Sequence, residues 1–469
     1  MAKSTAAIIL AAGEGTRMRS ALPKVLHPVG ELPLVAHVVR LALARRCNPI
    51  VVVVSPRGER VRAWLEAAFP KAPLVFAVQQ EQLGTGDAVT TGLAAMPKLE
   101  GQVLILYGDV PLLTAETLSR LGKAAHSKAL AFLSAEVPDP TGYGRVVRER
   151  GQVARIVEHK DASTHEKQIR EINVGVYLAT SELLRRTLKG VGRTNAQGEI
   201  YLTDIVAMAA REGGAVGLRV VDLNEVRGVN TRAELAEADA IARARIIAQH
   251  QARGVTFLDP HGTFVGANVT LGRDVLVGVG VQLRGHVKVG DGVHIEGPTV
   301  IQDSTVAKGA LIESFCHLED AAVGVGARVG PFARLRPGTE LDAEVRVGNF
   351  VEVKKSRLRK GAKANHLAYL GDADIGVASN IGAGTITCNY DGGPVKHRTV
   401  IGAEAFVGSN STLVAPLRIG ARSYVAAGST MTKDVPPNAL AFGRARQSNR
   451  EGYAEKLRAR KRPSPEKGR

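Results

Sequence analysis

The chain contains little cysteine and no long apolar run. Its three cysteines among 469 residues, Cys47, Cys316 and Cys388, are odd in number and lack the spacing of metal ligands. This scarcity argues against a disulfide framework and fits a reducing compartment. No stretch approaches the roughly 20 apolar residues that a membrane-spanning helix needs, and the N-terminus lacks the apolar region of a signal peptide. We therefore expect a cytoplasmic protein with no membrane insertion.

Acidic residues are also in the minority. The 45 Asp and Glu residues face 62 Lys and Arg residues, so the net charge is +17. Much of this excess lies in a C-terminal tail whose basic residues are Arg444, Arg446, Arg450, Lys456, Arg458, Arg460, Lys461, Arg462, Lys467 and Arg469. No nucleic-acid-binding motif accompanies the charge, so we expect no nucleic-acid partner. Residues 451–469 are expected to form a basic, disordered tail that aids solubility or attracts phosphorylated substrates.

The second half of the chain carries an aliphatic residue at every sixth position. The first uninterrupted series is Val265, Leu271, Val277, Leu283, Val289, Ile295 and Ile301. An α-helix has a period of about 3.6 residues and cannot keep such a stripe on one face. Short strands separated by turns can, with glycine taking the turn conformations that a Cβ opposes. The repeat predicts a parallel β-helix over residues 254–450.

The first half has a different pattern. Apolar runs at 6–10, 50–54 and 103–106 alternate with helical stretches, which predicts a Rossmann-like α/β domain over residues 1–230. Thr231 and Glu234 have the spacing of a capping box, and the alanine-rich segment that follows ends at Gly254. A helix over 231–253 is therefore expected, either as a linker or as the last helix of the first domain.

A glycine-rich turn follows the first apolar run. Gly13 and Gly15 expose backbone N–H groups that can bind phosphates, and the cations Arg17 and Lys24 lie close in sequence. Met18 stands where a dinucleotide-binding motif requires glycine, and the spacing of a P-loop is absent. The string from Leu10 through the Leu-Pro-Lys-Val-Leu segment resembles the signature of sugar-phosphate nucleotidylyltransferases.

An aspartate follows the apolar run at 103–106. Open α/β sheets bind ligands at this end of their strands, and Asp109 there could hold Mg²⁺, although it could equally cap the next helix. Two further segments, Gln79 with 82–86 and 141–145, look like the base-reading and sugar-reading loops of uridylyltransferases. That resemblance implies that Glu158 and Asn173 hold sugar hydroxyls.

The same resemblance implies a complete nucleotide-sugar site. The residues that it assigns to UTP and UDP-N-acetylglucosamine are Leu10, Ala11, Ala12, Gly13, Lys24, Gln79, Gly84, Thr85, Tyr107, Gly108, Asp109, Gly144, Glu158, Asn173 and Asn230. Asp109 and Asn230 are the implied Mg²⁺ ligands, and Arg17 and Lys24 the catalytic cations. The implied reaction is in-line attack of a sugar 1-phosphate on UTP, which needs positioning and charge neutralisation rather than a protein nucleophile.

Two segments interrupt the hexapeptide repeat, one at 349–358 that leads through 363–372 and another at 380–392. They contain His366, which alone would be read as a solvated surface residue. A neutral imidazole can take a proton from an amine near pH 7, and the basic Arg336 and Lys354 could hold a phosphate. Ser409 could donate to an oxyanion, and Glu352 could orient the base.

These segments resemble, nearly residue for residue, the family of bifunctional enzymes that are both glucosamine-1-phosphate N-acetyltransferase and N-acetylglucosamine-1-phosphate uridylyltransferase. The resemblance covers the chain to about Arg450 and implies a left-handed β-helix. It assigns His366 as catalytic base, assisted by Glu352 and Ser409. The implied glucosamine 1-phosphate residues are Arg336, Lys354, Tyr369, Asn380, Asn389 and Tyr390. The implied acetyl-CoA residues are Ala383, Asn389, Tyr390, Ser409, Ala427 and Arg444.

The family also implies a homotrimer with the acetyl-transfer site between neighbouring subunits. Two departures from its pattern, Asn365 and the loop 394–397, remove no functional residue. The expected function is acetylation of glucosamine 1-phosphate by acetyl-CoA, followed by uridylyl transfer from UTP. One alternative is a sugar-phosphate nucleotidylyltransferase whose β-helix is purely structural. Another is a non-catalytic scaffold, which would tolerate loss of Arg17, Lys24 and Asp109.

Overall fold

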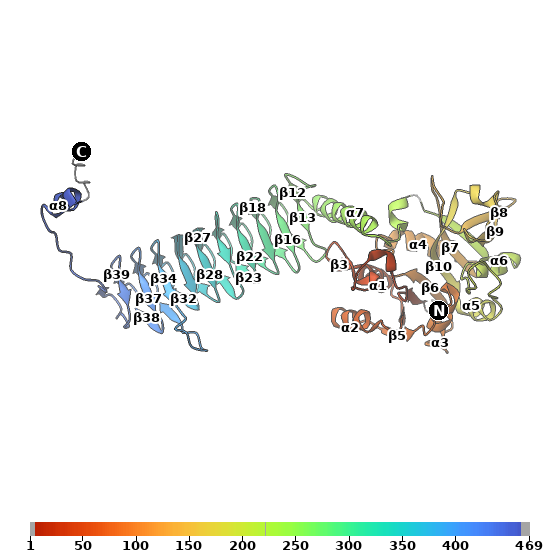
Figure 1. Ribbon diagram of the computed structural model, residues 1–469, viewed down its shortest axis with the longest axis horizontal. Coiled ribbons are helices and arrows are strands. Elements are labelled where there is room, and N and C mark those ends of the chain that lie inside the picture. Colours follow the sequence, from red (N-terminus) through yellow and green to blue (C-terminus); the bar gives the residue numbers. More distant parts are fainter. Residues whose placement is uncertain (1–4, 221, 461–469) are drawn as a thin grey trace, which may run out of the picture. The chain divides into compact units, whose positions relative to one another are not determined.

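The computed structural model describes residues 5–220 and 222–460, which form two compact units (Figure 1). The first compact unit runs to Ala248 and includes Val265–Ala267. The second comprises Gln249–Phe264 and the described residues from Asn268 onward. Each unit has its own sheets.

The first compact unit is built on a nine-stranded sheet of order β11-β7-β10-β6-β1-β4-β5, with the hairpin β8-β9 attached beside β10. These strands are β1 (Thr5–Leu10), β4 (Ile50–Val54), β5 (Leu74–Val78), β6 (Gln102–Tyr107), β7 (Leu130–Glu136), β8 (Arg145–Glu149), β9 (Gln152–Val157), β10 (Glu171–Thr180) and β11 (Ala215–Arg219). Strands β6, β1, β4 and β5 are parallel neighbours, whereas β10 is antiparallel to β6 and β7. A separate pair joins β2 (Pro28–Val29) to β3 (Leu32–Pro33).

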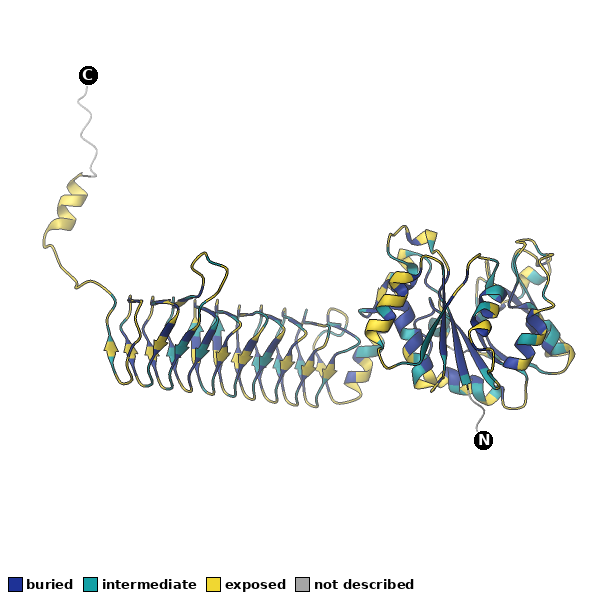
Figure 2. Cartoon of the chain, turned by 90° about the horizontal axis from the view of Figure 1, so that it is seen from below, coloured by how far each residue is buried: buried dark blue, intermediate teal, exposed yellow. Residues whose placement is uncertain are grey.

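Helices cover both faces of this sheet. They are α1 (Leu34–Ala44), α2 (Glu59–Ala68), α3 (Thr85–Ala94), α4 (Ala115–Ala124), α5 (Ser181–Leu188) and α6 (Asp204–Arg211), with 3-10 turns η1 (Thr16–Met18), η2 (Lys24–Leu26), η3 (Glu166–Gln168) and η4 (Leu223–Val226). Along β1, Ala7 and Ile9 enter one hydrophobic core while Ala6 and Ile8 enter the other. A central parallel strand is apolar on both faces because both are buried, as Figure 2 shows. The predicted α/β domain is confirmed.

Helix α7 (Arg232–Gln251) begins at the predicted capping box. The Thr231 amide donates to Glu234 Oε2 at 2.8 Å, and the Glu234 amide donates to Thr231 Oγ1 at 3.2 Å. The helix ends two residues before the predicted Arg253, and Gly254 follows with φ +94°. Ala238 and Ala242 share a core cluster with residues of the first compact unit.

The second compact unit contains three sheets of parallel strands, and consecutive strands of the chain, except the last, belong to the three sheets in turn. The eleven-stranded sheet contains β12 (Thr256–Phe257), β15 (Leu276–Val277), β18 (His294–Ile295), β21 (Leu311–Ile312), β24 (Arg328–Val329), β27 (Arg346–Asn349), β30 (Lys363–His366), β33 (Asn380–Ile381), β36 (Phe406–Val407), β39 (Tyr424–Val425) and β41 (Leu440–Ala441). The ten-stranded sheet contains β13 (Phe264–Val265), β16 (Gln282–Arg284), β19 (Val300–Gln302), β22 (His317–Glu319), β25 (Arg334–Leu335), β28 (Glu352–Lys354), β31 (Tyr369–Gly371), β34 (Ile386–Cys388), β37 (Thr412–Val414) and β40 (Thr430–Met431). The nine-stranded sheet of this unit contains β14 (Thr270–Leu271), β17 (Lys288–Val289), β20 (Thr305–Val306), β23 (Ala321–Val323), β26 (Thr339–Leu341), β29 (Arg357–Leu358), β32 (Ala373–Ile375), β35 (Thr399–Ile401) and β38 (Leu417–Ile419).

The aliphatic repeat forms the interior of this solenoid, and the predicted left-handed parallel β-helix is confirmed. Val277, Ile295, Ile312, Val329 and Val347 stack on successive coils and are at most 1% exposed. Burying such a side chain contributes about 1.5–3 kcal/mol. Val277 pairs with Ile295, eighteen residues on, whereas Ile295 pairs with Ile312, seventeen on. A turn one residue shorter therefore explains why the six-residue register slips after Ile301.

The tail differs in part from the expectation of disorder. Residues Tyr453–Arg460 form helix α8, in which every residue is exposed. Alanine, glutamate, lysine, leucine and arginine favour helix, which explains the local structure without tertiary contacts. Residues 461–469 of the predicted tail lie outside the described residues. Across 5–220 and 222–460, no helix is long and apolar enough to cross a membrane.

Candidate active sites

The first candidate site lies where two central strands end side by side. Leu10 at the end of β1 is in register with Tyr107 at the end of β6, and the two strands run parallel. The Gly108 amide donates to the Leu10 carbonyl at 2.9 Å. The glycine-rich turn and Asp109 therefore meet at one edge of the sheet, where open α/β folds bind their ligands.

A pocket of about 290 Å³ opens at this edge. Its lining residues are Leu10, Ala11, Ala12, Gly13, Lys24, Val25, Gln79, Gln82, Gly84, Thr85, Ala88, Tyr107, Asp109 and Glu199. Most of the residues predicted for the nucleotide are in this set. The volume lies near the lower end of the range for small-molecule sites, about 300–1,000 Å³.

The two glycines of the turn have different roles. A Cβ at Gly13 would meet no atom within 4 Å and would project into the open space of the pocket, so glycine keeps the backbone accessible there. Gly15 has φ +63°, and a Cβ on it would lie 2.5 Å from Lys24 Cβ. Glycine at position 15 therefore allows Lys24 to pack against the turn.

Lys24 joins the two predicted metal ligands. Its ammonium contacts Asp109 Oδ2 and donates to Asn230 Oδ1 at 3.0 Å. The Lys24 and Asp109 side chains are only 11% and 17% exposed. Asn230 reaches this position because the neighbouring Val229 amide donates to the Asp109 carbonyl at 2.9 Å. Residues 206 positions apart in the chain are thus brought together.

This donor set fits a hard divalent cation. A carboxylate oxygen and an amide oxygen converge on one positive group, and both are ligand types that Mg²⁺ prefers. Within the described part of the chain, no group of three or more His, Cys, Asp or Glu side chains could hold a metal. A cation bound to Asp109 and Asn230 would take the rest of its shell from phosphate and water, as Mg²⁺ commonly does.

Arg17 lies apart from this cluster. It is exposed on η1 and is not among the residues that line the pocket, whereas Lys24 is. The convergence of Arg17 and Lys24 on one triphosphate stays a prediction.

The glutamine segment is tied to the glycine-rich turn. Gln79 is 4% exposed, and its Nε2 donates to the Gly84 carbonyl at 3.2 Å and to Asp87 Oδ2 at 2.8 Å. Gln82 Nε2 donates to the Ala12 carbonyl at 3.1 Å. Gln82 and Glu199 both line the pocket but were not among the predicted site residues. Gln82 stands inside the recognised segment, whereas no local sequence signal marks Glu199.

The predicted sugar residues form a group of their own. The Asn173 amide donates to the Gly144 carbonyl at 2.8 Å, and a Cβ at Gly144 would lie 3.4 Å from the Glu158 carboxylate. Burial raises the pKa of Glu158, although a hydrogen bond from Thr203 at 3.0 Å opposes this. Burial, followed by the Glu158 charge, raises the pKa of Tyr107. Tyr107 lines the pocket, and a Cβ at Gly175, two residues after Asn173, would lie 2.7 Å from its ring.

The second candidate site lies on the β-helix around His366. His366 is exposed at the end of β30, opposite Asn349 on β27. Its Nδ1 lies 2.8 Å from Asn349 Oδ1. A bond in which Nδ1–H donates leaves Nε2 with a free lone pair, which is the state that a general base requires. Asn349 begins the segment 349–358 but was not among the predicted site residues, and its contact across the coils orients His366.

Cations gather on the neighbouring ten-stranded sheet. Arg336 Nη1 donates to Glu352 Oε1 at 2.8 Å, so Glu352 contacts Arg336 rather than His366. The charges of Lys396, then Arg336, lower the pKa of Lys354. Lys396 belongs to the loop 394–397, which departs from the family pattern and was not among the predicted site residues. Lys354 and Lys396, with Arg336 paired to Glu352, leave an excess of positive charge that can attract an anion such as a phosphate.

Tyr369 and Asn389 meet over a glycine. A Cβ on Gly371 would lie 2.5 Å from the Tyr369 hydroxyl and 2.6 Å from Asn389 Nδ2, so glycine is required for their approach. Asn389 is 4% exposed and donates to Asp372. Asn380 lies on β33, the strand next to β30. Tyr390 is 61% exposed.

The predicted acetyl-CoA positions follow one corner of the solenoid. The Asn410 amide donates to the Ala383 carbonyl at 2.7 Å, and the Gly428 amide donates to the Ser409 carbonyl at 2.8 Å. Ala427 precedes Gly428, and a Cβ on Gly428 would lie 3.8 Å from Arg444 Cδ. The Gly384 amide donates to the Leu367 carbonyl, beside His366, at 3.0 Å. The structure therefore aligns these positions with His366 along successive coils.

Comparison with known proteins agrees with both units. Residues 7–171 match the family model of the MobA-like NTP transferase domain. With the pocket at the carboxyl ends of β1 and β6, this match defines the first unit as a nucleotidyltransferase domain.

Full-length relatives identify the family. The chain is 51% identical to the bifunctional protein GlmU of Stutzerimonas stutzeri, over 95% of this chain and 98% of the relative. It is 47% identical to that of Sorangium cellulosum, over 97% of both chains. It is 49% identical to that of an Anaeromyxobacter species, over 97% of this chain and 93% of the relative. The chain belongs to the GlmU family of bifunctional proteins.

Proposed function

We propose that the chain catalyses two reactions. The second compact unit acetylates glucosamine 1-phosphate with acetyl-CoA, and the first transfers uridylyl from UTP to N-acetylglucosamine 1-phosphate. The products are UDP-N-acetylglucosamine and pyrophosphate. The observation that carries this proposal is the presence of two separate polar clusters, around Lys24 and around His366, in one member of a bifunctional family.

In uridylyl transfer, Asp109 and Asn230 would hold Mg²⁺, which supplies positive charge and orientation to the phosphates. Lys24, whose ammonium contacts both Asp109 and Asn230, neutralises phosphate charge in the same cluster. The open backbone at Gly13 offers N–H groups to the triphosphate. The sugar phosphate oxygen attacks the α-phosphorus, and the bond to pyrophosphate breaks. Positioning and charge neutralisation suffice for this displacement.

In acetyl transfer, Nε2 of His366 takes a proton as the substrate amine attacks the thioester carbonyl. The new C–N bond forms, the C–S bond breaks, and the thiolate of coenzyme A leaves with a proton. Asn349 fixes the tautomer of His366, and the hydroxyl of Ser409 donates to the oxyanion. Arg336, Lys354 and Lys396 hold the phosphate of the sugar.

Assembly as a homotrimer is supported by an exposed aromatic ladder at the same corner. Phe315, Phe332 and Phe350 are 54%, 45% and 56% exposed. Their rings stack with centroid distances of 4.7 and 5.2 Å. The Leu367 amide donates to the carbonyl of Asn349, the residue before Phe350. Leu367, which follows His366, is therefore the next residue on this corner. A neighbouring subunit that covers this ladder would border the acetyl-transfer site.

Two assays on the purified chain test the proposal. Thiol release with acetyl-CoA and glucosamine 1-phosphate reports the first reaction, and pyrophosphate release with UTP and N-acetylglucosamine 1-phosphate reports the second. The alternative of a purely structural β-helix predicts pyrophosphate release without thiol release. The scaffold alternative predicts neither.

Replacing Lys396 with alanine should raise the KM for glucosamine 1-phosphate about tenfold or more, because a charge-assisted contact to phosphate contributes about 1.5–3 kcal/mol. Lys396 is the largest cause of the lowered pKa of Lys354, so its removal should raise that pKa. The alkaline rise of KM should then move to higher pH. Thiol release measured between pH 7 and 10 tests both effects, with the exposed Lys360→Ala variant as control. An unchanged KM would remove Lys396 from the phosphate site.

Replacing Phe332 with glutamate should weaken subunit association about 30-fold or more, since aromatic anchors contribute about 2 kcal/mol or more at interfaces. Light scattering should show monomers, with acetyl transfer reduced and uridylyl transfer retained. Val325→Glu is the matched control, because Val325 is 55% exposed in the turn after β23 rather than after β24. A Phe332→Glu variant that stays trimeric would contradict the proposed interface.

A further inference from the structure

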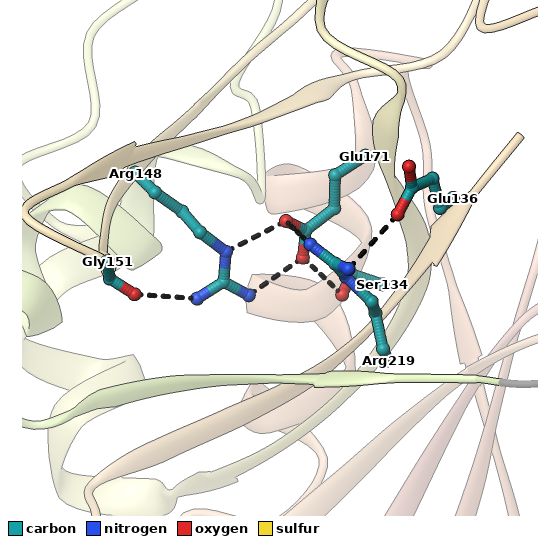
Figure 3. A network of polar contacts seen from close by, with 6 residues as sticks. All are labelled: Ser134, Glu136, Arg148, Gly151, Glu171 and Arg219. Carbon is teal, nitrogen blue, oxygen red and sulfur yellow. Dashed lines mark hydrogen bonds and ion pairs between the residues drawn. The ribbon is translucent and has the colours of Figure 1, made fainter.

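A buried carboxylate in the first compact unit is held by three side chains (Figure 3). Glu171, the first residue of β10, is 6% exposed. Arg148 donates to it through two nitrogens, Nε to Oε2 at 2.8 Å and Nη2 to Oε1 at 2.7 Å. Ser134 Oγ donates to Oε1 at 2.7 Å, and Arg219 Nη2 donates to Oε2 at 3.2 Å. The carboxylate is therefore fixed in position and orientation.

The outer contacts of this network balance its charge. Arg219 Nη1 donates to Glu136 Oε2 at 3.0 Å, and Arg148 Nη1 donates to the Gly151 carbonyl at 3.3 Å. Burial disfavours ionisation of Glu171, but hydrogen bonds from Arg148, Ser134 and Arg219 outweigh it and lower its pKa to about 2. The carboxylate is thus charged at any pH used to assay the enzyme.

The network adds a polar contact between segments that also share a hydrophobic core, in which Val146 and Ile156 of the hairpin lie with Tyr177 of β10. The hairpin β8-β9 pairs with β10 at one register position, Arg145 opposite Ile172. Arg148 lies on β8, so its double hydrogen bond to Glu171 is a further attachment of the hairpin to β10. Two bonds from a planar guanidinium fix orientation as well as distance. We call the Arg148–Glu171 pair the hairpin clamp.

The clamped segments carry the proposed sugar residues. Gly144 directly precedes β8, Glu158 directly follows β9, and Asn173 lies two residues beyond Glu171 on β10. Residues two apart on a strand share a face and lie about 7 Å apart. A change in how Arg148 meets Glu171 would therefore shift Gly144 and Glu158 relative to Asn173.

We propose that Arg148 and Glu171 are positioning residues for the sugar end of the uridylyl-transfer site. The hairpin clamp sets the distance between the two sides of that end, and so determines affinity for an N-acylated hexose 1-phosphate but not for the nucleotide. This inference rests on the function proposed for the first compact unit.

The nucleotide end has separate supports. Gln79 is held by Gly84 and Asp87, and Lys24 by Asp109 and Asn230. These groups follow β5, β6 and the glycine-rich turn rather than the hairpin. Loss of the hairpin clamp should therefore raise the KM for N-acetylglucosamine 1-phosphate without raising the KM for UTP. A general loss of folding would not affect the two constants so differently.

The test uses Arg148→Met and Glu171→Gln in the full chain. Pyrophosphate release should show a KM for N-acetylglucosamine 1-phosphate that is raised about tenfold or more. Misplacing a bound substrate by about 1 Å can cost up to about 100-fold in rate, so a shift of the sugar-binding residues should have a clear effect. The KM for UTP should stay within about twofold of the wild-type value. The ratio of the variant KM to the wild-type KM for N-acetylglucosamine 1-phosphate should not vary between pH 6 and 9. Arg148→Lys keeps the positive charge but cannot make both hydrogen bonds to Glu171. It should raise the KM for N-acetylglucosamine 1-phosphate by an intermediate amount. It also serves if the other variants fail to fold.

Arg186→Met is the matched control, because Arg186 Nη2 donates to both carboxylate oxygens of Glu212 on the surface. It should change neither constant. Thiol release by the second compact unit should be unchanged in every variant, which verifies an intact chain. Equal rises in both KM values, or no rise in either, would overturn the positioning role. Absence of pyrophosphate release from the wild-type chain would instead overturn the proposed function itself.

Discussion

His366→Ala should lower the kcat of acetyl transfer by about 10²–10⁴-fold, the usual contribution of a general base. Uridylyl transfer should stay within about twofold, because His366 lies in the second compact unit and Lys24 and Asp109 lie in the first. The amine of glucosamine 1-phosphate is protonated near neutral pH, so attack on the thioester needs a group that accepts its proton. The side chain of His366, oriented through Nδ1 by Asn349, is placed to do this through Nε2.

The measurement is thiol release under saturating acetyl-CoA, with pyrophosphate release measured on the same preparation. His317→Ala is a suitable control, because His317 is also exposed on the β-helix but belongs to β22. His366→Gln retains a polar side chain of similar size and should be as inactive as the alanine variant. Acetylation within tenfold of wild type in either variant would remove His366 from the role of base.

Asp109→Asn should reduce uridylyl transfer by about 10³-fold, since a metal ion contributes several kcal/mol of transition-state stabilisation and each 1.36 kcal/mol is tenfold in rate. The substitution removes the negative charge that meets the Lys24 ammonium and that would bind Mg²⁺. The metal would then have two neutral amide ligands, at positions 109 and 230, and no carboxylate ligand from this pair. Acetyl transfer should be unaffected.

Pyrophosphate release at increasing Mg²⁺ concentration tests this expectation, and Mn²⁺ bound to the protein with UTP can be counted by electron paramagnetic resonance. Glu212→Gln is the control, because it removes a surface carboxylate from an ion pair with Arg186. Full activity of Asp109→Asn with unchanged Mn²⁺ binding would exclude Asp109 as a ligand. Loss of both activities from either Asp109→Asn or His366→Ala would contradict two independent sites.

The two folds were predictable because each has a strong pattern of apolar residues. The continuous apolar run at Ala6 to Ile9, buried on both faces, and the six-residue stripe at Val277 and Ile295 are both enforced by burial. The capping box at Thr231 is a local hydrogen-bonding unit and was predictable for the same reason. The extra helix α8 was missed because charge dominated the interpretation of the tail.

The candidate sites were predictable only where their residues stand in recognised strings. Lys24, Asp109 and Gln79 do, and the structure brings all three to one pocket. Glu199 does not, because its place depends on a backbone pairing in which the Ile200 amide donates to the Leu83 carbonyl. The exposure of Arg17 was likewise decided by the course of the chain through η1.

By itself, the sequence determined the class of each fold and the identity of the groups that can bind phosphate, metal or protons. Hydrophobic periodicity and local capping depend on residues close together in sequence, so they can be predicted from the sequence. Only the tertiary structure decided which groups meet: Lys24 with Asn230, His366 with Asn349 and Arg148 with Glu171. These contacts join residues from different strands or coils, and their distances are set by packing across the whole unit rather than by any local pattern.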